Sequence, residues 1–117
     1  MSTVKTAKDL LIAARALIED PSRWTTHSYA KDRDGHSVAE FSGQACKWCA
    51  AGALSRAIYD CEGKYEFDQT EASNGAWSAI HRASHLRFNH QSVITVNDQL
   101  GHEAVLQVYD DAIARVA

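Results

Sequence analysis

The sequence lacks the features that mark membrane-spanning, secreted and nucleic-acid-binding proteins. No apolar run reaches the length of about 20 residues that a helix needs to cross a bilayer, and no signal-peptide pattern is present. The cysteines, Cys46, Cys49 and Cys61, are an odd number, whereas secreted disulfide frameworks use cysteines in pairs. The formal net charge is -3 and no lysine or arginine run occurs, which disfavours binding to duplex nucleic acid or to an anionic membrane. We therefore expect a cytoplasmic protein with reduced thiols.

Hydrophobic residues make up 45% of the sequence, which is enough for one core. A chain of 117 residues is too short for two separate cores. We predict a single domain over residues 1–117. Four stretches carry apolar residues at the spacing of an α-helix. Their predicted starts are marked by capping residues, namely Thr6 with Asp9, Ser42, Asp68 with Glu71, and Asn97-Asp98 with Gly101.

A short β-hairpin is predicted between the first two helices. Arg23 to Lys31 is rich in aromatic and β-branched residues, and Asp34-Gly35 is a two-residue turn signal before His36 to Phe41. Ser92 to Val96 is predicted as a short third strand against this hairpin. The predicted fold class is therefore mainly α with a small β-hairpin (α+β), with about four helices packed around one core.

Gly52 falls inside the second predicted helix, where glycine costs about 1 kcal/mol relative to alanine. Its missing side chain permits another backbone to cross the helix closely, and the hairpin is the nearest element in sequence. We therefore predict that Trp48-Cys49 and Asn97-Asp98 meet near Trp24. Asn97 or Asp98 is then expected to accept amide hydrogen bonds at the start of the last helix.

The Cys46-Lys47-Trp48-Cys49 motif allows two catalytic interpretations. Near a helix start it is compatible with a redox dithiol, but it does not open a βαβ unit as thioredoxin-like chains require. Cys49 is also a candidate nucleophile, with a histidine as base and Asn97 or Asp98 as the orienting group, yet no family-specific signature surrounds it. We favour the interpretation that both cysteines pack in the core.

A zinc site is a further alternative, because His81 and His85 are four residues apart and could complete a ligand set with Cys46 and Cys49. The gap between the cysteines and the histidines exceeds the usual spacing of about 12 to 15 residues. We therefore expect neither a metal nor another cofactor. The neighbouring carboxylates Asp32 and Asp34 are interpreted as turn residues.

A non-enzymatic binding or regulatory module is the leading functional hypothesis, with an unknown protein or small ligand as its partner. Aromatic residues crowd the hairpin and the following helix, where Trp24, Tyr29, Phe41 and Trp48 could line a groove. The alternative is a small cysteine-centred enzyme or zinc protein using Cys49 with Cys46 or with Asn97 and Asp98. The predicted binding residues are Trp24, Tyr29, Trp48, Cys49, Asn97 and Asp98.

One combination of residues resembles a known family. It comprises Trp24, Tyr29-Ala30-Lys31-Asp32 with Gly35, the segment from Trp48 to Leu54, and Asn97-Asp98 before an amphipathic C-terminal helix. These features resemble a family of small uncharacterised proteins from bacteria and their phages. The resemblance runs from the first helix to the end of the chain. It implies a shared fold and a common surface patch, but it assigns no activity.

Overall fold

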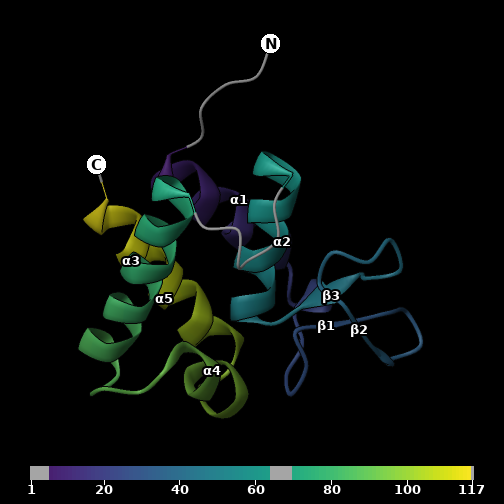
Figure 1. Ribbon diagram of the computed structural model, residues 1–117. Helices are drawn as coiled ribbons and strands as arrows, with labels where there is room; N and C mark the ends of the chain where they lie inside the picture. The colour runs from purple at the N-terminus through teal and green to yellow at the C-terminus, as the bar shows by residue number, and fades with distance from the viewer. Residues whose placement is uncertain (1–5, 64–69, 117) are drawn as a thin grey trace.

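The chain folds into an α+β structure in which four long helices pack together and a small sheet lies to one side of them (Figure 1). The computed structural model describes residues 6–63 and 70–116. The elements in chain order are α1 (Ala7–Ile18), the 3-10 helix η1 (Pro21–Arg23), β1 (Ala30–Lys31), β2 (Ser37–Val38), β3 (Lys47–Trp48), α2 (Ala50–Glu62), α3 (Glu71–Arg87), α4 (Val93–Thr95), the π-helix η2 (Val96–Leu100) and α5 (His102–Arg115). The predicted fold class is confirmed.

Capping residues define where the helices begin. Thr6 and Asp9 form the predicted capping box at the start of α1. At α3 the capping box is formed by Thr70 and Ser73, so the prediction of Asp68 with Glu71 was wrong, and Asp68 itself lies outside the described residues. The side chain of Cys49 caps α2 by accepting a hydrogen bond from the amide of Gly52.

The core lies between the four long helices, where α1 packs against α2, α3 and α5. Small side chains such as Ala14, Ala53 and Ala83 are buried at these contacts, so the helices approach closely. Tyr109 of α5 is the largest fully buried side chain, and its hydroxyl donates to the carbonyl of Ala50, 2.6 Å away. This bond ties α5 to the first residue of α2.

The sheet has the strand order β2-β1-β3, and both pairings are antiparallel. Ala30 of β1 pairs with Val38 on one side and Trp48 on the other. The hairpin of β1 and β2 agrees with the prediction, whereas β3 was not predicted. A parallel bridge between Trp24 and Trp48 joins the segment after η1 to the edge of β3.

Two boundaries differ from the sequence prediction. The second helix begins at Ala50 and not after Ser42, because Lys47–Trp48 pairs with β1 as a strand. Cys46 therefore precedes this strand and does not lie on a helix. The segment from Ser92 to Val96 is not a strand, because the Ser92 hydroxyl caps α4 by accepting the amide hydrogen bond of Thr95. Asn97-Asp98 consequently belongs to the π-helix, and α5 begins after Gly101.

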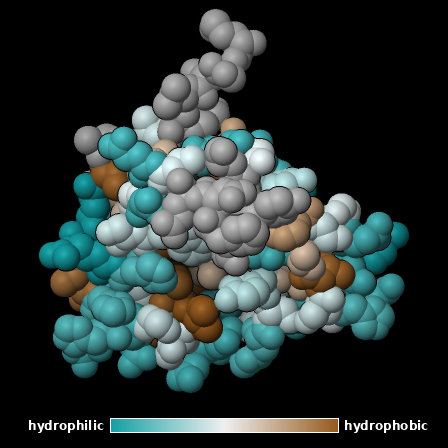
Figure 2. Space-filling model, in the orientation of Figure 1, coloured by the Kyte–Doolittle hydropathy of each residue, from teal (hydrophilic) through white to brown (hydrophobic). Residues whose placement is uncertain are grey.

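The face shown in Figure 2 is mostly hydrophilic, and its hydrophobic side chains form small separate patches. Among the described residues, no helix is both long and apolar enough to cross a membrane.

Candidate functional site

Asn97 links three segments that are distant in the sequence. Its Oδ1 accepts hydrogen bonds from the indole Nε1 of Trp24 at 2.7 Å and from the amide of Ala50 at 2.8 Å. Its Nδ2 donates to the carbonyl of Thr25 at 3.0 Å and to Oδ1 of Asp98 at 3.1 Å. The side chain is buried, with 1% of the residue exposed, and uses its acceptor and both amide protons. We call Asn97 with Trp24, Thr25 and Ala50 the Asn97 latch.

The π-helix η2 presents Asn97 and the neighbouring Asp98 to the same region. Short π-helical turns are frequent at functional sites because they change the direction of side chains within a helix. Oδ1 of Asp98 accepts a hydrogen bond from the amide of His27, 3.0 Å away. His27 has a φ of 63°, a left-handed conformation that is uncommon for a residue other than glycine. Asp98 therefore holds an unusual turn next to the latch.

The charge of Asp98 is favoured by its surroundings. Partial burial opposes ionisation, but the hydrogen bonds from the His27 amide and from Asn97, together with the nearby His27 and Lys31 side chains, lower the pKa of Asp98 below its ordinary value. An oxygen of this carboxylate also lies 3.5 Å from Nδ1 of His27. The site thus contains a carboxylate that stays ionised near neutral pH.

Gly52 lets the backbone of Tyr29 cross the start of α2. A Cβ atom at Gly52 would lie 2.0 Å from the carbonyl oxygen of Tyr29, a distance that real Cβ atoms do not reach. The same carbonyl accepts a hydrogen bond from the amide of Cys49 at 3.1 Å. The predicted close crossing of another backbone at Gly52 is confirmed.

A pocket of about 580 Å³ lies beside the Asn97 latch. Its walls come from the turn before β1, from β2 and the residues after it, from the start of α2, and from α4 and η2. The lining residues are His27, Ser28, Tyr29, Ser37, Val38, Ala39, Glu40, Cys49, Ile94, Asn97 and Asp98. Four predicted binding residues, Tyr29, Cys49, Asn97 and Asp98, therefore line one pocket.

The expected aromatic groove does not form this pocket. Trp24 and Trp48 are absent from its lining, because Trp24 is held by Asn97 and Trp48 is buried, with its indole donating to the carbonyl of Glu40 at 2.9 Å. The ring of Phe41 packs against Tyr59. Of the four aromatic residues, Tyr29 alone lines the pocket. Trp24 and Trp48 support the site from within the fold.

The surroundings of Cys49 disfavour a thiolate. Burial raises the pKa of the Cys49 thiol, and the charges of Asp98 and Glu40 raise it further, despite hydrogen bonds from nearby amides. A nucleophilic or redox cysteine requires the opposite shift. Within the described chain, Cys46 and Cys49 are both free thiols. The site therefore provides no activated cysteine.

Cys49 should consequently react slowly with a thiol reagent. In the variant Cys46→Ser/Cys61→Ser only Cys49 remains, and in Cys49→Ser/Cys61→Ser only the more exposed Cys46 remains. We expect Cys49 in the native protein to react at least about 10-fold more slowly than Cys46 at pH 8, since the rate follows thiolate content and access. The rates are measured with Ellman's reagent, and equal rates in urea serve as the control. A native Cys49 faster than Cys46 would contradict this account.

The candidate zinc ligands are not brought together. The described residues contain one group of three side chains close enough to share an ion, and it does not include Cys46, Cys49, His81 or His85. His81 instead stacks on Trp77.

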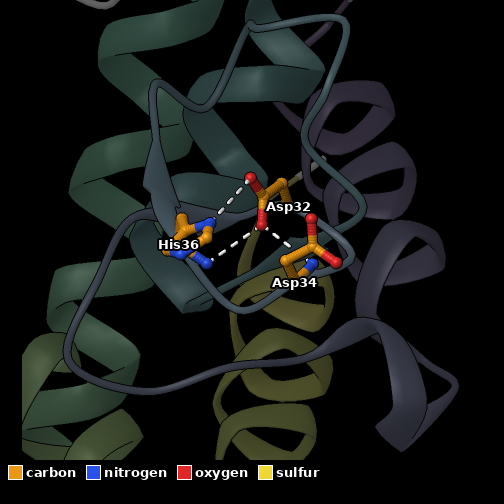
Figure 3. Close-up of side chains that lie close together, drawn as sticks. All are labelled: Asp32, Asp34 and His36. Carbon is orange, nitrogen blue, oxygen red and sulfur yellow. Dashed lines mark hydrogen bonds and ion pairs between the residues drawn. The ribbon is translucent and has the colours of Figure 1, made fainter.

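The one close group is formed by Asp32, Asp34 and His36, shown in Figure 3. Oδ1 of Asp32 accepts hydrogen bonds from the amides of Asp34 and His36, both at 2.9 Å. The bond from the His36 amide is the main cause of the lowered pKa of Asp32. These contacts close the hairpin turn between β1 and β2, in agreement with the interpretation of Asp32 and Asp34 as turn residues.

Several pocket residues carry no signal in the sequence. His27, Glu40 and Ile94 stand in no recognisable motif, and each comes from a different segment. The positive φ of His27 could not be predicted, because the residue is neither a glycine nor an asparagine, the types that commonly adopt this conformation. The tertiary fold, in which the segment before β1 is hydrogen-bonded to η2, brings these residues to the same pocket.

Comparison with known proteins gives a family but no function. Residues 2–115 match a family described as "Family of unknown function (DUF6197)". Searches of curated proteins and of solved structures found no match.

Proposed function

The chain belongs to the DUF6197 family, to which no function is assigned, and we propose from the geometry of its site that it is a binding module. Its ligand-binding site is the pocket beside the Asn97 latch. Catalysis through a cysteine is disfavoured, because Cys49 is the one thiol among the described lining residues and its pKa is raised. A regulatory role and a bacterial or phage origin are parts of the same proposal.

The observation that carries the proposal is that a fully bonded buried amide fixes the pocket walls. Asn97 joins the residues before the hairpin to the start of α2, and Tyr109 fixes the same end of α2 from the core side. Such preorganisation lowers the entropic cost of binding. Binding pockets of small ligands are commonly about 300–1,000 Å³ in volume, and this pocket of about 580 Å³ lies within that range.

A fragment screen followed by ¹H–¹⁵N NMR tests the proposal. We expect fragments to shift the amides of the pocket residues in the wild type but not in Ala39→Phe, which places a large ring in the pocket. Gln44→Phe is the matched control, because Gln44 is exposed and is not among the lining residues. The proposal is wrong if no fragment shifts the pocket amides, or if Ala39→Phe and the wild type respond alike.

A further inference from the structure

The carboxyl group of Glu40 is the least expected group in the pocket. Glu40 is 7% exposed, yet its carboxyl group forms no hydrogen bond or ion pair with any residue in ranges 6–63 and 70–116. Its backbone carbonyl, by contrast, accepts bonds from Trp48 and Arg56. A carboxylate in a largely buried residue that has no partner in the protein keeps its full capacity to accept hydrogen bonds from a ligand. A positively charged ligand would supply those hydrogen bonds.

Glu40 is a lining residue of the pocket. No side-chain oxygen or nitrogen of the described chain is both fully enclosed and unbonded, so the Glu40 carboxyl oxygens retain access to solvent. Glu40 lines the pocket together with Cys49, and its charge contributes to the raised pKa of the Cys49 thiol. The carboxyl group is therefore open to solvent in a residue that lines the pocket, and its charge acts on another lining residue.

The other lining residues also favour a positively charged ligand. Asp98 adds a second carboxylate, and His27 is the only lining residue able to carry a positive charge in the described part of the chain. Tyr29 is 49% exposed and Ile94 48%. Both can cover the apolar part of a ligand, and a tyrosine ring also attracts cations through its π face. The two carboxylates of the lining would repel an anion.

We propose that the pocket binds the ammonium or guanidinium group of an organic cation, with Glu40 as its main charge partner. This inference rests on the proposed function and names the ligand class of that pocket. Glu40 and Asp98 bind the cationic head, while Tyr29 and Ile94 contact the apolar body. The cation is either a free amine or the lysine side chain of a partner protein.

NMR titrations with four probes test the inference on the wild type. We expect benzylammonium to bind at the pocket amides at least about 10-fold more tightly than the neutral benzyl alcohol, and benzoate not to bind, because charge-assisted hydrogen bonds are stronger than neutral ones. The capped amino acid N-acetyl-lysine methylamide tests the second source of the cation. Tighter binding of this probe than of benzylammonium supports a partner's lysine, and the reverse order supports a free amine.

The variant Glu40→Gln should weaken benzylammonium binding by about 10-fold or more and leave benzyl alcohol binding unchanged. Glu103→Gln is the matched control, because Glu103 is exposed on α5 and does not line the pocket. Equal binding of benzylammonium and benzyl alcohol at the pocket would overturn the inference while leaving the proposed function intact. Absence of binding by all four probes would overturn the inference too. The fragment screen then tests separately whether the pocket binds any ligand. The comparison of probes on the wild type remains decisive even if Glu40→Gln does not fold.

Discussion

Asn97→Leu should lower the free energy of unfolding by about 3 kcal/mol or more. Leucine has a similar size but can neither donate nor accept, so the indole of Trp24, the amide of Ala50 and the carbonyl of Thr25 lose their partner together. Each buried polar group left unpaired costs about 1–3 kcal/mol. The change is measured by urea unfolding followed by tryptophan fluorescence, which also reports on Trp24.

Gln99→Ala is the control for this variant, because Gln99 lies in the same π-helix and is exposed. Its effect should stay within about 0.5 kcal/mol. If Asn97→Leu were as mild as Gln99→Ala, the Asn97 latch would not stabilise the fold, and the rigidity assigned to the pocket walls would have no basis.

Gly52→Ala is the second variant with a large expected effect. Its Cβ would collide with the carbonyl of Tyr29, so α2 and the hairpin must move apart and strain the bond from the Cys49 amide. We expect a loss of about 1–3 kcal/mol in the free energy of unfolding, the usual cost of overpacking, although alanine is the better helix former. Pocket amides should also shift in the NMR spectrum.

Gly43→Ala provides the comparison, because nothing lies within 4 Å of a Cβ atom at this position. It should change stability by less than about 0.5 kcal/mol. A Gly52→Ala protein as stable as the wild type, with an unchanged spectrum, would show that the close crossing does not constrain the site.

Local signals in the sequence predicted the first helix and the hairpin correctly. Thr6 with Asp9 and the Asp34-Gly35 turn are short-range motifs whose hydrogen bonds lie within a few residues. The close crossing at Gly52 could also be predicted, because glycine inside a helix lowers stability and is favoured there where another backbone must approach closely. These features need no knowledge of the rest of the fold.

The errors arose where a tertiary contact or a helix cap outweighs the intrinsic preference of the residues. Cys46 and Cys49 continue the apolar spacing of α2, yet pairing with β1 makes Lys47–Trp48 a strand. The β-branched residues between Ser92 and Val96 favour a strand, but capping by Ser92 starts a helical turn. Asn97 was expected to bond at the start of the last helix, and it bonds at the start of α2 instead.

The pocket could be predicted only in part for the same reason. Cys49, Asn97 and Asp98 stood out as a motif, whereas Glu40 is one of 15 acidic residues in the sequence. Glu40 is distinguished by being a largely buried residue whose carboxyl group has no partner among the described residues, and burial depends on how the residues after β2 pack. Sequence patterns carry no record of that packing.

The central claim is that the pocket beside the Asn97 latch is a binding site, and a crystal structure with the tightest-binding fragment tests it most directly. The account predicts that the fragment lies between Tyr29, Glu40 and Asp98, with its polar head about 3 Å from a carboxylate oxygen. The latch bonds of Asn97 should be unchanged. A fragment bound elsewhere on the protein, with this pocket occupied by water alone, would contradict the claim.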